Sequence, residues 1–420
     1  MTELDISVAG RVFYKCKSLS SKPFGARNMM SLTLCRRGAV GWIAVCAIAV
    51  ANLVAIASRS WAQPADSSNY QRWDYDEKAR RNITQVGKIL INGTLEADQE
   101  KAFDDYYDQY SLARWTQSGN EGALPKFRKE LRENLMQAKV GVAHNRLTDL
   151  ILRKMTEAAF GNDFDLAVRI NAMLMIGELN VEDTNKPGLS PTPLLAAIPI
   201  LVRAVRDPGL PDPVKIAALV GLVLHATLSI GSDQAAADVS AAALELVKSK
   251  NVPGRTAAGF AWMRARAIEI LGLLGNVGAN NVIAETLVDI LADGSARMPV
   301  RQAAAEAVGK LNFQGAVNFD PGKLANALGS LAVEAMETAA RDLDQQKPGV
   351  TSHMKSAVYA ALAGINALAA APPSPSQERV LTVQQKLKQI GELLEKDDED
   401  SIVATIAPFA ADLKSLLARP

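Results

Sequence analysis

The chain has 420 residues, of which 48% are hydrophobic, 22% are charged and 5% are aromatic. This composition indicates a folded globular protein, and the length leaves room for two or three domains. Alanine and leucine dominate the sequence, which favours helices packed through small contacts over a β-sandwich. The formal net charge of +1 excludes a strongly basic nucleic-acid-binding protein on bulk charge, so no nucleic-acid partner is expected.

Positive charge and cysteine are both concentrated at the N-terminus. Residues 1–62 contain eight Lys or Arg against two acidic residues, whereas residues 63–420 contain 38 basic and 43 acidic residues. All three cysteines, Cys16, Cys35 and Cys46, precede residue 63. Residues 63–420 therefore contain no disulfide, no cysteine nucleophile and no cysteine-ligated zinc.

An uncharged apolar segment, residues 38–58, follows two arginines and precedes the small-residue pattern Ser-Trp-Ala at 60–62. This order is typical of a cleaved export signal. The segment is also long enough to span a bilayer, so an uncleaved membrane anchor is the alternative. Both interpretations predict that residues 63–420 lie outside the cytoplasm, in the periplasm or cell envelope. A start at Met29 or Met30 would give a signal of ordinary length.

The next region, residues 63–144, is rich in aromatic side chains and contains five of the seven tyrosines. Phe103, Tyr107 and Tyr110 have the spacing of one helical face. We expect a helical region whose rings pack against its neighbour and cover the first repeat. An aromatic binding platform is the alternative.

From about residue 145 an apolar pattern recurs at offsets 0, 4, 7/8 and 11, which form one stripe on an α-helix. The stripe begins five times, at starts that lie roughly 37 to 54 residues apart, a spacing near that of two-helix solenoid repeats. The starts are Val168, Val214, Met263, Val300 and Met354. Three copies carry glycine at offset 9, where a small residue allows close helix approach; these are Gly177, Gly272 and Gly309.

An apolar helical segment precedes each striped helix, and Pro-, Gly- and Asp-rich joints separate the two. These partner segments are residues 146–158, 194–205, 236–249, 281–292 and 323–344. Because a single helix pair cannot enclose a core, neighbouring pairs must bury the stripes between them. The sequence therefore predicts an all-α fold, an α-solenoid or superhelix of about five two-helix repeats over residues 145–370.

The repeats resemble the HEAT family. The resemblance rests on Asp212-Pro213-x-Lys215 after Leu201-Val202-Arg203-Ala204-Val205, and on Val300-Arg301-x-x-Ala304-Ala305-x-Ala307-Val308-Gly309. It implies a scaffold or adaptor that binds proteins along a curved surface. Because some HEAT-like proteins are bilin lyases or pigment chaperones, the resemblance leaves an enzyme or accessory protein as the alternative.

A Pro/Ser linker, residues 371–376, separates the repeats from residues 377–420. Apolar residues at helical spacing in the latter predict a two-helix cap for the open end of the stack. Between the two helices lies the acidic run Asp397–Asp400. The run lacks the alternating ligand pattern of a calcium loop, so we expect a solvated helix start.

The sequence contains no motif that would specify catalysis. It has no His-Glu-x-x-His for zinc, no phosphate-binding Gly-x-x-x-x-Gly-Lys-Ser/Thr loop and no Gly-x-Ser-x-Gly elbow. His225 stands on an apolar stripe, where a histidine is usually a core residue. We therefore expect no enzyme activity, no cofactor and no metal.

One polar feature recurs, which is a basic residue at offset 1 of every stripe: Arg169, Lys215, Arg264, Arg301 and Lys355. If these helices line a concave face, the bases form a ladder that binds an acidic peptide or carboxylates. Alternatively, each base pairs with a nearby loop acid, such as Asp165, Asp212 or Asp293, and holds a repeat joint together.

The sequence thus predicts an exported scaffold that binds a protein or peptide partner along its curved face. The membrane is involved only through residues 38–58, if they are not cleaved. The alternative is a lyase-like or chaperone-like accessory protein with a small-molecule pocket around His225 and Trp262 on the concave face.

Overall fold

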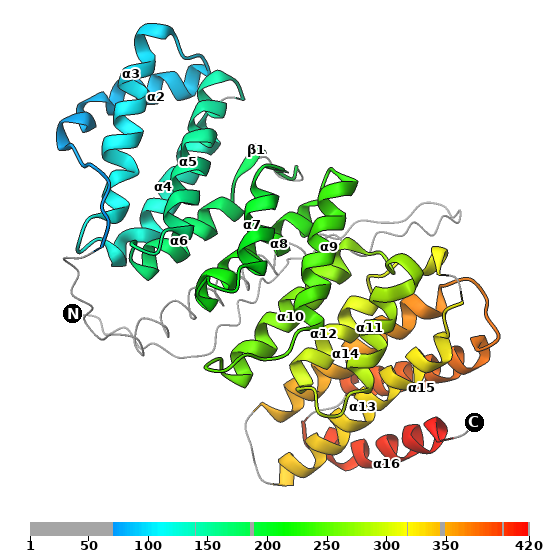
Figure 1. The fold of residues 1–420 in the computed structure, drawn as a ribbon. Coiled ribbons are helices and arrows are strands. Elements are labelled where there is room, and N and C mark those ends of the chain that lie inside the picture. Colours follow the sequence, from blue (N-terminus) through cyan, green and yellow to red (C-terminus); the bar gives the residue numbers. More distant parts are fainter. Residues whose placement is uncertain are drawn as a thin grey trace, which may run out of the picture. The chain divides into compact units, whose positions relative to one another are not determined.

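The structure, a computed structural model, describes residues 70–138, 140–184, 189–316, 318–344, 349–396 and 399–418. Within these ranges the chain is built almost entirely from α-helices, so the predicted all-α class is confirmed. Residues Ser67–Pro420 form one compact unit (Figure 1). The predicted export segment, residues 38–58, lies outside the described residues. No helix in the described ranges is both long and apolar enough to cross a membrane.

A helical block precedes the repeats and is joined to them by aromatic contacts. Its elements are η2 (Glu77–Asn82), α2 (Ile83–Asn92), α3 (Ala97–Asp105), the π-helix η3 (Tyr106–Ser111), η4 (Ala113–Thr116), η5 (Glu121–Ala123) and α4 (Leu124–Gln137). The Trp73 ring lies 5.6 Å from that of Phe164, and its Nε1–H donates to Glu157 Oε1 at 3.0 Å. The block therefore packs on the first repeat, as the sequence predicts.

The aromatic face in this block is interrupted after Tyr107. Phe103 and Tyr107 are fully buried, with ring centroids 5.0 Å apart. The next turn is a π-helix, in which the N–H of Leu112 donates to the carbonyl of Tyr107 at 2.8 Å. Because a π-turn contains one more residue than an α-turn, Tyr110 rotates away from the predicted face and is only half-buried.

Ten helices of the described chain follow in two rows. The five striped segments form the stripe row, α6 (Leu166–Gly177), α8 (Asp212–Leu228), α10 (Ala257–Leu274), α12 (Met298–Val308) and α14 (Val350–Ala369). The predicted partner segments form the partner row, α5 (Val142–Phe160), α7 (Ala197–Arg206), α9 (Asp233–Lys248), α11 (Val282–Ala292) and α13 (Pro321–Asp344).

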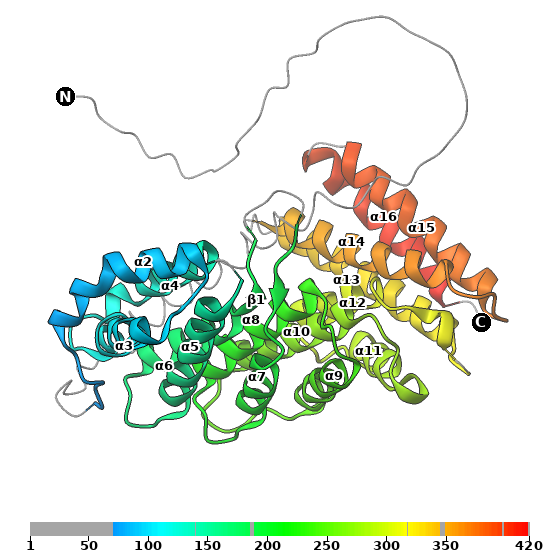
Figure 2. The ribbon, with the colours of Figure 1, turned by 90° about the horizontal axis from the view of Figure 1, so that it is seen from above.

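The two rows pack layer by layer in chain order. Each stripe helix contacts the next stripe helix, from α6 to α14, and also the partner helix that precedes it in the sequence. In Figure 2, α7, α9 and α11 lie along one edge, with α8, α10 and α12 beside them. The five residues at offset 0 are all buried, which shows that the apolar stripes supply the core between successive layers.

Glycine allows the closest of these crossings. A Cβ placed on Gly177 would lie 2.5 Å from Gly221 Cα, and one on Gly272 would lie 2.7 Å from Ala307 Cα. Real Cβ atoms do not approach backbone atoms so closely, so these helices can meet only where a side chain is missing. The predicted role of glycine at offset 9 is confirmed at these two positions.

A short antiparallel hairpin lies between the first and second helix pairs, and two helices follow the last pair. The hairpin strands β1 (Asn180–Glu182) and β2 (Thr192–Pro193) lie between α6 and α7. Helices α15 (Gln377–Lys396) and α16 (Glu399–Leu417) pack on α13, and α15 also packs on α14. The sequence predicts this helix pair, but no periodic pattern marks the hairpin.

Candidate functional site

The predicted basic ladder lies near the start of the stripe helices, and most of it is buried. Arg169, Lys215 and Arg301 are only 6%, 7% and 3% exposed. Arg264 and Lys355 are half-buried. The burial of the Lys215 ammonium lowers the pKa of this group, although Asp212 opposes the shift.

Three arginines of the ladder make the same contact. The Nε–H of Arg169 donates to the carbonyl of Ala159 at 3.4 Å, that of Arg264 to Val247 at 3.1 Å, and that of Arg301 to Leu291 at 3.0 Å. Each acceptor is the penultimate residue of the preceding partner helix. Carbonyls in a last helical turn lack intrahelical donors and carry partial negative charge. Each guanidinium therefore joins the two helices of its own repeat.

The loop acids suggested as partners of these bases bind other groups. Asp165 accepts from the backbone N–H of Ala167 at 2.7 Å, and Asp293 accepts from that of Ser295 at 2.9 Å. Both carboxylates thus stabilise their own turns, as Asp commonly does at helix starts and loops. The three arginines join the helices of each pair through helix carbonyls rather than through these acids, and Arg301 also forms an ion pair with Glu334 of α13.

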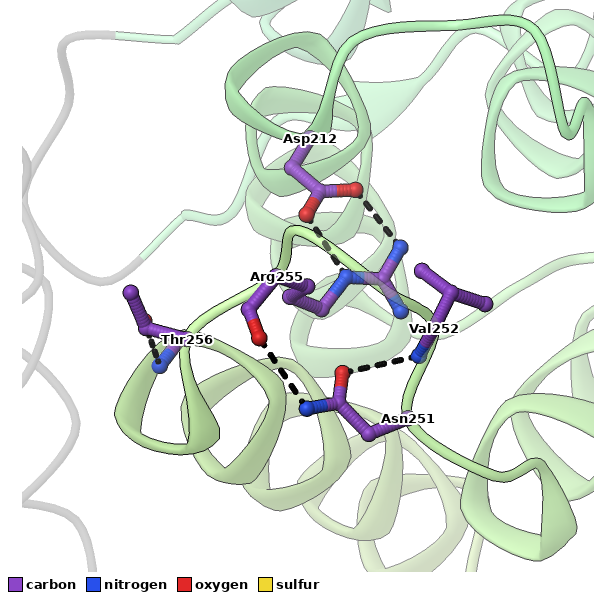
Figure 3. Close-up of polar contacts among 6 residues, drawn as sticks. Asp212, Asn251, Val252, Arg255 and Thr256 are labelled. Carbon is purple, nitrogen blue, oxygen red and sulfur yellow. Dashed lines mark hydrogen bonds and ion pairs between the residues drawn. The ribbon is translucent and has the colours of Figure 1, made fainter.

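Asp212 forms a bidentate joint between layers (Figure 3). The Arg255 guanidinium binds it with Nε–Oδ2 and Nη2–Oδ1 distances of 2.6 Å each. Arg255 lies in the loop before α10, whereas Asp212 begins α8. Asn251 holds that loop by donating to the carbonyl of Arg255 at 3.1 Å. The bond to Asp212 raises the pKa of Arg255, so the guanidinium remains charged at neutral pH.

The structure does not bring the two predicted pocket residues, His225 and Trp262, into one site. His225 is 1% exposed in α8, and the backbone of Gly177 in α6 lies beside its ring. Burial lowers the pKa of His225 to about 4, so the imidazole is neutral at pH 7. Trp262 is half-buried in α10, under the Arg266 guanidinium at 5.5 Å from its ring centroid.

Trp262 belongs to a surface that the sequence pattern did not single out. Along the stripe row, one side of each helix from α8 to α14 stays at least partly exposed. We call this side the open face. Its residues include Ile216, Val220, Leu224, Trp262, Arg266, Glu269, Gln302, Glu306, Ser356 and Tyr359. Most of these residues lie near offsets 2 to 3 and 6 of the repeated pattern, so this spacing could have located the open face in the sequence.

The open face combines an aromatic ring with paired and unpaired polar groups. Arg266 Nη1 lies 2.6 Å from Glu269 Oε2, yet the buried Nε of Arg266 has no hydrogen-bond partner within the described ranges. Gln302 Nε2 donates to Ser356 Oγ at 2.5 Å and so links α12 to α14. The face can therefore offer the Trp262 ring, the exposed part of the Arg266 guanidinium and several acceptors to a bound chain.

No family model matches the sequence, and no curated protein matches it. Among the residues that the structure describes, no group of three or more His, Cys, Asp or Glu side chains is arranged to hold a metal ion. The assignment of function therefore depends on the geometry of the chain itself.

Proposed function

We propose that this protein is an exported HEAT-like α-solenoid that acts as a scaffold or adaptor and binds a protein or peptide along its open face. The layer-by-layer packing of the stripe and partner rows supports the solenoid. The apolar segment at residues 38–58, preceded by arginines, supports export to the periplasm or cell envelope, with or without cleavage.

The observation that carries the proposal is the pairing of Trp262 with the partly exposed guanidinium of Arg266 on a face that other helices of the described chain leave uncovered. Tryptophan and arginine dominate the binding energy of protein interfaces. The exposed part of the guanidinium can donate to a carbonyl or carboxylate of a bound chain. The open face is therefore a better binding surface than the basic ladder, whose arginines already bind helix carbonyls.

A small-molecule pocket around His225 and Trp262 has less support, because His225 lies against α6 whereas Trp262 lies on the open face of α10. The described contacts suggest no reacting group for a lyase-like activity, so the proposal remains a binding protein without catalysis.

The test is site-specific photo-crosslinking of the full-length chain in its own cells. A crosslinking amino acid is placed at Trp262 or Tyr359 on the open face, and at Lys88, which is exposed on α2 outside both rows, as the control. We expect discrete higher-mass adducts from the two open-face positions and none from Lys88. The proposal fails if the open-face positions give no discrete adduct, or if Lys88 gives the same one.

A further inference from the structure

The partner row has a gap between α9 and α11. Within the described chain, α7 packs on α9 and α11 packs on α13, but α9 and α11 make no extensive contact. A groove of about 820 Å³ that is open to solvent lies there instead. Figure 2 shows α9 and α11 as neighbours along the edge of the partner row.

The walls of the groove suit an incoming helix. The α9 wall carries Ala237 and Ala241 one turn apart, with Leu244 beyond them, and all three line the groove. Small residues one turn apart let a second helix approach closely, as glycine does between α6 and α8. Leu274 of α10 and Val282 of α11 add an apolar floor and an opposite wall.

The charged residues in and beside the described groove are acidic. Asp233 is the one charged residue in the groove lining of the described chain, and no Lys or Arg lines it. Glu285 and Asp289 are exposed on α11, three and seven residues after Val282, which places them on the same side of that helix. None of these three carboxylates forms an ion pair within the described residues. The groove is therefore apolar in its floor and acidic at its rim.

We propose that this groove binds a basic amphipathic α-helix of a partner protein. The apolar stripe of that helix packs between α9 and α11, and its flanking Lys or Arg side chains reach Asp233, Glu285 and Asp289. Two copies of the groove facing each other would bring acid against acid, which disfavours self-association through it. This site is separate from the open face and does not depend on binding there.

The test measures binding of a synthetic helix to the full-length protein. The probe is a peptide of roughly 18 residues of Leu, Ala and Lys with one apolar stripe, a length sufficient for a helix. It carries a fluorophore and a photo-crosslinker, and a matched peptide has Glu in place of every Lys. The groove variant is A241R, and its control is A258R, which adds the same charge at an exposed alanine near the start of α10, outside the groove.

We expect the Lys peptide to crosslink to α9 and α11 and to bind about tenfold or more tightly than the Glu peptide. A241R should lower its affinity about tenfold, because the guanidinium occupies the groove and repels the Lys side chains, whereas A258R should change it by less than about twofold. Circular dichroism melting of both variants reports whether either one fails to fold. If A241R does not fold, D233N is used and should weaken binding a few-fold.

The proposal is overturned if the Glu peptide binds as tightly as the Lys peptide, or if A241R and A258R lose affinity equally. Crosslinks between two copies of the chain would also overturn it, because they identify a second copy as the occupant. Crosslinks confined to the open face would place the peptide at the other surface and leave the proposed function standing, so the two proposals can fail separately.

Discussion

The crossing of α6 and α8 at Gly177 and Gly221 gives a quantitative test of the layered packing. A Cβ on Gly221 would lie 2.8 Å from Gly177 Cα and 3.2 Å from both methyl carbons of Leu201. Carbon atoms prefer separations of about 3.5–4.0 Å. The Gly221→Ala variant therefore forces α6 and α8 apart by about 1 Å or displaces Leu201.

The expected cost follows from the close packing of the core. Overpacking of this kind costs about 1–3 kcal/mol, while Gly-to-Ala in a helix interior contributes about 1 kcal/mol of stability. Gly87 in α2 provides the matched control, because a Cβ there meets no atom within 4 Å. Both substitutions gain the same helix propensity, so the difference between their free energies of unfolding measures the cost of overpacking at Gly221.

Urea unfolding followed by circular dichroism measures this difference. We expect Gly87→Ala to be as stable as the parent or more stable, and Gly221→Ala to be less stable than Gly87→Ala by about 1–3 kcal/mol. Equal free energies of unfolding for the two variants would refute the close crossing of α6 and α8.

Three further predictions concern the joints and the buried histidine. Arg301→Met should lower the free energy of unfolding by about 1–3 kcal/mol in the same urea assay, because it leaves the carbonyl of Leu291 without its donor and removes the ion pair with Glu334. An unchanged midpoint would contradict the joint role. A double-mutant cycle of Arg255→Gln and Asp212→Asn should give a favourable coupling free energy of about 1 kcal/mol. If the two substitutions change the free energy of unfolding additively, the ion pair does not couple the layers. His225 should make stability depend on pH. Its pKa of about 4 lies below the usual value of 6.5, so the unfolded chain binds the proton more readily. The contribution of His225 to the free energy of unfolding is complete above about pH 6.5. It is lost as the pH falls towards 4, by at most about 3 kcal/mol. The His225→Leu variant should show a flatter dependence of stability on pH over this range.

The sequence predicts the two helix rows well because apolar periodicity directly reports which side of a helix is buried. Val168, Val214 and Met263 begin helical stripes in the sequence, and each is buried between layers in the structure. The three arginines at offset 1 could be located in the sequence, but their role could not be decided, since each donates to a backbone carbonyl. Every residue has a carbonyl, and only the geometry shows that those of Ala159, Val247 and Leu291 are within reach.

Other features depend on tertiary context that no local pattern encodes. The hairpin of Asn180–Glu182 and Thr192–Pro193 is too short to show an alternating pattern, and it is held by contacts with α5 and α8. The bond between Arg255 and Asp212 joins residues 43 apart that share no periodic position. The groove exists only because α9 and α11 are spaced apart, a property of the packing rather than of either helix.

The most direct test of the account is a crosslink between adjacent stripe helices. Gln302 of α12 and Ser356 of α14 touch across the open face, with 2.5 Å between Nε2 and Oγ. Cysteines at these two positions, in a chain whose three native cysteines are replaced by serine, should be joined within one molecule by a short bis-thiol reagent. A control pair at Gln302 and Gln234, from different rows, should not be joined. Failure of the first pair to crosslink, or equal yields from both pairs, would contradict the layered arrangement on which the proposed scaffold depends.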